Sequence, residues 1–163
     1  MIALVSTLTS PMVRKLGLVA SLLILLGSFG GGSLQKRNSL LSAANLDFLS
    51  FGHGAAFSNV TLWLGTVLFV VAWVLMGKLV IDKVVDADYV RRTLCMWLVP
   101  LVGAAPIMSR DVYSYLMQGT LLRDGLNAYT QGPASNPNQI LFEVSHDWRN
   151  TTTPYGPLHL WLG

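Results

Sequence analysis

Three long apolar runs divide the chain, and polar segments separate them. They cover residues 13–32, 59–81 and 93–108, and a fourth run begins at residue 157 and continues to the last residue, 163. The first two have about the 20 residues that a helix needs to cross a bilayer, and the third is shorter. The pattern predicts an all-α polytopic membrane protein with three transmembrane helices in residues 1–108. We expect residues 157–163 to begin a fourth span of a longer protein.

The first run has two interpretations. Arg14 and Lys15 precede it and small residues follow it, as in a secretory signal peptide. We favour a membrane anchor because further spans follow in the chain. Gly27 and Gly31 form a G-x-x-x-G pair, which either lets a second helix approach closely or only ends the first helix.

Composition supports a membrane protein. Residues of the apolar types make up 52% of the chain and charged residues 12%, against about 25% charged in ordinary soluble domains. The net charge of +3 is small and spread along the chain, which argues against a nucleic-acid partner. The single cysteine, Cys95, excludes an intrachain disulfide.

Basic residues orient the predicted spans, because cytoplasmic loops carry an excess of Lys and Arg. Three spans place six basic residues on the side of the N-terminus and five on the other, and those nearest the spans favour a cytoplasmic N-terminus. Residues 109–156 are then extracytoplasmic. Nucleotide sugars are absent on that side, so an enzyme that transferred a sugar there would need a lipid-linked donor. The first group is Arg14, Lys15, Lys78, Lys83, Arg91 and Arg92; the second is Lys36, Arg37, Arg110, Arg123 and Arg149.

Residues 109–125 predict a short amphipathic helix at the membrane surface. Ser109 can cap its start, Asp111 lies in the first turn, and Gly125 can take the left-handed conformation that ends a helix. At helical spacing the residues form two faces. The apolar face holds Val112, Tyr115, Leu116, Gly119 and Leu122, and the polar face holds Asp111, Ser114 and Gln118.

The following segment, residues 123–157, is rich in amide, hydroxyl and glycine residues with aromatic residues between them. Such side chains suit sugars, whose hydroxyl groups need hydrogen bonds and whose C–H faces stack on rings. An ordinary polar loop with interfacial aromatic residues explains the composition equally well. The aromatic residues are Tyr129, Phe142, Trp148 and Tyr155.

Three separate motifs resemble one enzyme family. They are R-D-V-Y-S-Y-L with Q-G in residues 110–119, G-L-N-A-Y with G-P in residues 125–133, and T-P-Y-G-P-L in residues 153–158. Their order and spacing are similar to those of the actinobacterial polyprenyl-phosphomannose-dependent α-1,6-mannosyltransferases. These are multi-spanning glycosyltransferases of the GT-C class.

The resemblance implies an inverting enzyme of the plasma membrane whose active site lies on the extracytoplasmic side. It would move mannose from polyprenyl-phosphomannose to an α-1,6-mannan acceptor of lipomannan or lipoarabinomannan type. By this resemblance Asp111 is the general base that takes the proton of the acceptor hydroxyl group. The alternative is that Asp111 only caps its helix and pairs with Arg110.

The same resemblance suggests a set of substrate-binding residues. Arg110 could hold the donor phosphate or anchor the chain at the interface, and Tyr115 is expected to pack more than to bind. A divalent cation is the one candidate cofactor, with His146 and Asp147 as a weak pair of ligands, so the metal stays unknown. The predicted substrate-binding residues are Arg110, Tyr113, Ser114, Gln118, Tyr129 and Tyr155.

Two other functional classes fit parts of the pattern. A secondary transporter would explain the spans, but it should carry ionisable or broken-helix sites near the middle of the membrane. A non-catalytic membrane scaffold would explain everything except the polar motifs of residues 109–158.

Overall fold

The computed structural model describes residues 2–34 and 40–162, and side chains are described for residues 10–34 and 41–162. All regular secondary structure in these residues is helical, which confirms the predicted all-α class. Lys36 and Arg37, which entered the charge comparison, lie outside the described residues. The α-helices are α1 (Ile2–Gly31), α2 (Leu40–Ala43), α3 (Gly52–Ile81), α4 (Ala87–Val102), α5 (Asp111–Arg123) and α6 (Pro157–Leu162). The short 3-10 helices are η1 (Asp47–Ser50), η2 (Pro133–Ser135), η3 (Gln139–Phe142) and η4 (His146–Trp148).

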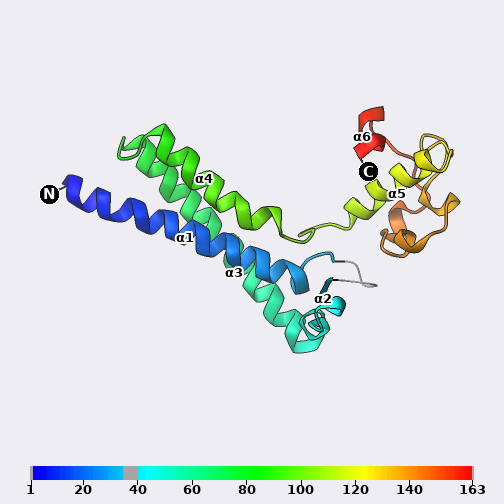
Figure 1. The fold of residues 1–163 in the computed structure, drawn as a ribbon, viewed down its shortest axis with the longest axis horizontal. Helices are drawn as coiled ribbons and strands as arrows, with labels where there is room; N and C mark the ends of the chain where they lie inside the picture. The colour runs from blue at the N-terminus through cyan, green and yellow to red at the C-terminus, as the bar shows by residue number, and fades with distance from the viewer. Residues whose placement is uncertain (1, 35–39, 163) are drawn as a thin grey trace. The chain divides into compact units, whose positions relative to one another are not determined.

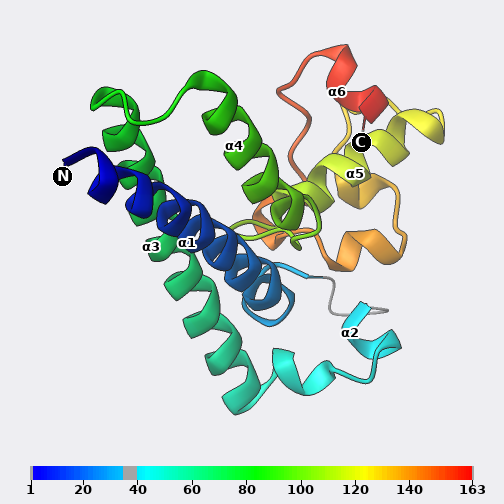
Figure 2. The same cartoon turned by 60° about the vertical axis from the view of Figure 1, so that its left-hand side comes forward.

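The chain forms two compact units, one of residues up to 107 and one from residue 108 onward. In the N-terminal unit, α1 and α3 lie side by side and α4 packs along α1 (Figures 1 and 2). Residues Ser10–Gly31 of α1 and Gly52–Ile81 of α3 are long and apolar enough to cross a membrane. Large apolar side chains of α3, among them Trp63 and Trp73, are exposed, as lipid-facing residues would be.

The third predicted span, residues 93–108, is helical only over its first part. Helix α4 begins earlier, at Ala87, and ends at Val102. Its 16 residues rise by about 24 Å, less than the about 30 Å of a hydrocarbon core. The number of transmembrane spans therefore stays a prediction.

Glycine residues allow the close approach of α1 and α3. A Cβ atom added to Gly27 would collide with the backbone of Leu62, and one added to Gly31 would lie 3.0 Å from the Cα atom of Asn59. The G-x-x-x-G pair therefore has both of the roles considered for it. Helix α3 packs on these glycines, and α1 ends at Gly31. The indole of Trp97 is fully buried and donates a hydrogen bond of 2.9 Å to the carbonyl oxygen of Arg14, which fixes α4 on α1.

In the C-terminal unit, α5 is the central element, and α6 and the 3-10 helices η2 and η3 pack on it (Figure 1). The predicted helix exists, but its predicted apolar face is only partly right. Val112 and Leu116 pack against the core and Gly119 is buried, but the main buried side lies elsewhere. The buried stripe runs through Tyr113, Met117 and Leu121, four residues apart, whereas Leu122 is 41% exposed. The reason is that the loop after α5 folds back and covers it, so that Val144 packs against Tyr113 and Met117.

Local signals fix both ends of α5. At its start Arg110, and not the predicted Ser109, occupies the cap position and makes no side-chain cap bond. The Ser109 hydroxyl, one residue earlier, accepts the backbone N–H of Asp111 at 3.1 Å. At its end Gly125 has the predicted left-handed conformation, with φ of 78°. The N–H of Leu126 then bonds to the carbonyl oxygen of Leu121 at 2.8 Å, which is the Schellman pattern.

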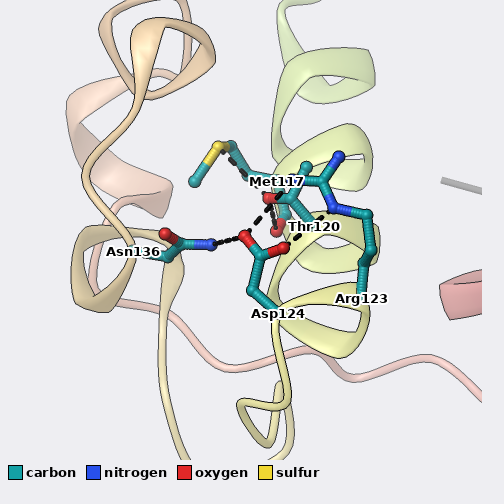
Figure 3. Close-up of polar contacts among 5 residues, drawn as sticks. All are labelled: Met117, Thr120, Arg123, Asp124 and Asn136. Carbon is teal, nitrogen blue, oxygen red and sulfur yellow. Dashed lines mark hydrogen bonds and ion pairs between the residues drawn. The ribbon is translucent and has the colours of Figure 1, made fainter.

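The loop that leaves α5 is tied to the end of the helix by Asp124 (Figure 3). Its carboxylate accepts a bond of 2.8 Å from Arg123 and one of 2.7 Å from the side-chain amide of Asn136. These two bonds lower the pKa of Asp124 below its usual value. The loop is thereby directed back along α5.

Candidate functional site

A pocket opens beside α5 in the C-terminal unit, and it contains four of the predicted site residues. Its volume is about 110 Å³. Sites that enclose whole small molecules measure roughly 300–1,000 Å³, so this pocket would hold one small group, such as part of a sugar ring. The residues that line it are Asp111, Ser114, Tyr115, Gln118, Trp148, Thr151, Thr152, Pro154 and Tyr155.

Helical spacing brings the first half of this lining together. Asp111, Ser114, Tyr115 and Gln118 follow one another at i, i+3, i+4 and i+7, so they share one side of α5. The returning loop supplies the rest of the lining, namely Trp148, Thr151, Thr152, Pro154 and Tyr155. The predicted polar face of the helix therefore lines a pocket and does not face bulk solvent.

The carboxylate of Asp111 lies in this lining without a basic partner. Its backbone N–H bonds to Ser109, but Arg110, the partner that the helix-cap alternative required, pairs with the carboxylate of Glu143 instead. Among the described residues no hydrogen bond or ion pair engages the Asp111 carboxylate. The group is thus free to accept a proton or a hydrogen bond from a ligand.

Ser114 offers a second free group. The residue is 4% exposed, and its hydroxyl oxygen has no hydrogen-bond partner in the described part of the chain. A buried polar group without a partner costs about 1–3 kcal/mol, so few such groups persist without a reason. Ser114 lines the pocket, but its hydroxyl oxygen is closed to solvent, so a ligand hydroxyl group would remove this cost only after the side chain rotates toward the pocket.

Sequence reasoning missed His159, which is not part of the lining but contacts three residues that are. Its Nε2 atom lies 3.1 Å from Oε1 of Gln118. The imidazole ring packs on two phenol rings, at 4.8 Å from the ring centre of Tyr115 and 4.7 Å from that of Tyr155. A histidine inside an apolar run was the signal that could have identified it, because an ionisable residue in such a run usually has a function.

The phenol hydroxyl groups of Tyr115 and Tyr155 are hydrogen-bonding groups of the site. The pKa of Tyr115 is raised by its hydrogen bond with Tyr155, and further by partial burial and the negative charge of Asp111. The hydroxyl oxygens of Tyr115 and Tyr155 lie 3.4 Å apart. Both phenols are therefore polar contacts for a ligand, and Asp111 is the one carboxylate in the lining.

Three predicted site residues lie outside the pocket. Arg110 donates a 2.8 Å hydrogen bond to the carbonyl oxygen of Glu143 in addition to the ion pair, and its guanidinium lies 5.1 Å from the ring centre of Tyr113. Tyr113 belongs to the buried core, where burial raises the pKa of its phenol. Tyr129 is 46% exposed, and its backbone N–H bonds to the side chain of Asn127 at 2.9 Å.

The two residues considered as metal ligands, His146 and Asp147, are exposed in η4. Within the described residues no group of three or more His, Cys, Asp or Glu side chains could hold a metal ion.

Comparison with known proteins gives consistent similarities. The family model described as "Alpha-(1->6)-mannopyranosyltransferase, N-terminal domain" matches residues 14–163. The chain is 56% identical over 149 residues to "Alpha-(1->6)-mannopyranosyltransferase A" of Corynebacterium glutamicum, a match that covers 86% of this chain and 30% of that protein. It is 43% identical over 143 residues to the protein of the same name from Mycobacterium tuberculosis, covering 88% and 28%.

A third relative, "Alpha-(1->6)-mannopyranosyltransferase B" of Corynebacterium glutamicum, is 30% identical over 161 residues, covering 91% of this chain and 26% of that protein. The chain thus spans less than a third of the length of the curated relatives it matches. No solved structure matches it.

Proposed function

Since the chain belongs to the α-(1→6)-mannopyranosyltransferase family, as its N-terminal domain, we propose that the whole protein is a mannosyltransferase of the plasma membrane. It moves mannose from a polyprenyl-phosphate donor to an α-1,6-mannan acceptor of lipomannan or lipoarabinomannan type. We expect a lipid-linked donor, because the predicted orientation of the spans puts residues 109–156 on the extracytoplasmic side, where nucleotide sugars are absent. The positions of the basic residues in the sequence support that orientation.

In the proposed reaction Asp111 is the general base. The oxygen of the acceptor 6-hydroxyl group attacks C1 of the donor mannose, and the bond from C1 to the phosphate oxygen breaks. The phosphate leaves with the electron pair of that bond, and the hydroxyl proton passes to the Asp111 carboxylate. Attack opposite the leaving group converts a β-linked donor into an α-linked product. Proton transfer of this kind contributes about 10²–10⁴-fold to a rate.

The chemistry of the pocket favours the acceptor sugar over the donor phosphate. Its nine lining residues include one carboxylate, five hydroxyl residues and one amide, and no Lys, Arg or His. A phosphate beside Asp111 would face like charge without a neutralising cation, which is unfavourable at short range. Neutral sugar hydroxyl groups, by contrast, would meet donors and acceptors from both α5 and the returning loop. We therefore assign the acceptor sugar to this pocket.

The single observation that carries the proposal is the Asp111 carboxylate, which lines the pocket without a basic partner among the described residues. The test is mannosyl transfer from polyprenyl-phosphomannose to an α-1,6-mannoside, with full-length protein in membranes. Asp111→Asn should lower the rate by about 10²-fold or more at unchanged protein abundance. The matched control is Asp82→Asn, a change to an exposed carboxylate in the N-terminal unit.

Equal transfer by wild type and Asp111→Asn would mean that the base lies elsewhere. If the wild type transfers no mannose with a competent acceptor present, the transporter and scaffold alternatives return. In that case a transporter would be recognised by substrate uptake into vesicles.

A further inference from the structure

Gln118 depends on a neighbour to present one end of its side chain to the pocket. The residue is 5% exposed, and it lines the pocket on the same side of α5 as Asp111 and Ser114. A carboxamide has an accepting oxygen at one end and a donating NH2 group at the other. Which end faces the ligand decides whether Gln118 donates or accepts.

His159 sets this orientation in the structure. Its Nε2 atom lies 3.1 Å from the Gln118 amide oxygen, so the imidazole donates from Nε2 and the oxygen is turned toward α6. The NH2 group then remains for the pocket, and no bond from it is formed within the described residues. The packing of the imidazole on Tyr115 and Tyr155 limits its rotation.

We propose that His159 is a positioning residue that holds Gln118 as a hydrogen-bond donor to a hydroxyl oxygen of the acceptor sugar. This inference rests on the proposed function, because it assigns the pocket to the acceptor. Gln118 follows Asp111 by seven residues, about 10 Å along the helix axis. Gln118 therefore contacts a hydroxyl group other than the one that Asp111 deprotonates. Loss of the Gln118 contact weakens acceptor binding more than it slows the chemical step.

Two substitutions of His159 separate the hydrogen bond from the ring. His159→Phe keeps an aromatic ring between the two tyrosines and removes the N–H donor. His159→Gln removes the ring and keeps an amide N–H at a similar reach. In full-length protein we expect His159→Phe to raise the acceptor KM about three- to tenfold, the effect of one neutral hydrogen bond, with the donor KM and kcat little changed. His159→Gln should stay near the wild type.

The double variant shows whether His159 acts through Gln118. Gln118→Ala alone should raise the acceptor KM as much as His159→Phe, and the two together should raise it no further, because they remove one contact. If the double variant raised the acceptor KM by the product of the two single increases, the proposal would be overturned. A normal acceptor KM in either single variant would also overturn it. So would a loss confined to His159→Gln, which would show that only the ring matters. Gln139→Ala, at an exposed position in η3, is the matched control for loss of an amide.

A binding measurement distinguishes failure of this inference from failure of the proposed function. Calorimetric titration of an α-1,6-mannoside into full-length Asp111→Asn protein reports the pocket without turnover. A Kd that rises three- to tenfold on adding His159→Phe supports the role of His159, whether or not the wild type transfers mannose from this donor. An unchanged Kd overturns this inference and leaves the proposed function standing, whereas no binding of the mannoside overturns both.

Discussion

Glu143 holds Arg110 at two points, through an ion pair with its carboxylate and through its carbonyl oxygen, which accepts a 2.8 Å bond from Nε of Arg110. The Glu143 side chain is 5% exposed and that of Arg110 is 27% exposed. Because Arg110 directly precedes Asp111, this pair fixes the start of α5 against the returning loop. The arrangement favours a structural role for Arg110 over a contact with the donor phosphate.

We predict that either single change, Arg110→Met or Glu143→Leu, destabilises the protein by about 2–3 kcal/mol. The figure is below the about 3–5 kcal/mol for a fully enclosed pair because Arg110 is partly exposed. The double variant Arg110→Met/Glu143→Leu should recover most of this loss, since no charge is left buried alone. Thermal unfolding in detergent measures stability, and mannosyl transfer measures activity.

Activity of the double variant decides the role of Arg110. Transfer that recovers together with stability is the expected result for a residue that only holds α5 in place. Recovered stability with transfer still lost would contradict this and would assign the guanidinium to the donor phosphate. Arg123→Met, a change to an exposed arginine at the other end of α5, is the control for loss of charge.

The hydroxyl of Ser114 should matter for binding and not for folding. Ser114→Ala removes a buried group that has no partner among the described residues, so the free energy of unfolding should stay the same or rise by about 1 kcal/mol. The acceptor KM should nevertheless rise severalfold, because a ligand loses that contact. Unfolding and transfer are measured on the same preparation of full-length protein.

Ser58→Ala supplies the matched comparison. Ser58 is as buried as Ser114, but its hydroxyl donates a 3.1 Å bond to the carbonyl oxygen of Leu49. Its removal should lower stability by about 1 kcal/mol and leave the acceptor KM alone. A Ser114→Ala variant that loses stability like Ser58→Ala, with a normal KM, would show that Ser114 has only a structural role.

The helices were predictable where the determining interactions are local. Apolar runs located α1 and α3, and the left-handed Gly125 ended α5 as expected, because neither depends on distant residues. The buried side of α5 depends on contacts that periodicity does not contain. Tyr113 is buried because Val144, 31 positions later, packs on it, so the helix has no single solvent face.

The site was predictable to a similar extent. Asp111, Ser114 and Gln118 share a pocket because helical spacing alone puts them on one side of α5. The partners that give these residues their roles are remote in sequence. Glu143 is 33 positions from Arg110, and His159 is 41 positions from Gln118, inside a run whose composition indicated only a membrane span.

The close packing of α1 on α3 gives a prediction for the N-terminal unit. A Cβ atom added to Gly65 would lie 2.8 Å from the backbone nitrogen of Ile24 and 2.9 Å from the carbonyl oxygen of Ala20. Backbone atoms cannot rotate away, so Gly65→Ala must push the two helices apart. We expect it to destabilise the protein by about 1–3 kcal/mol, the usual cost of overpacking.

Gly77 lies on the same helix and provides the control. A Cβ atom there would have nothing within 4 Å, so Gly77→Ala meets no steric cost. It should be neutral or stabilise α3 by about 0.5–1 kcal/mol, because alanine loses less backbone entropy than glycine in a helix. Thermal unfolding of the two variants in detergent therefore compares the same substitution on one helix with and without a neighbour. Equal unfolding temperatures for both would mean that α1 and α3 do not pack at Gly65 as the structure describes.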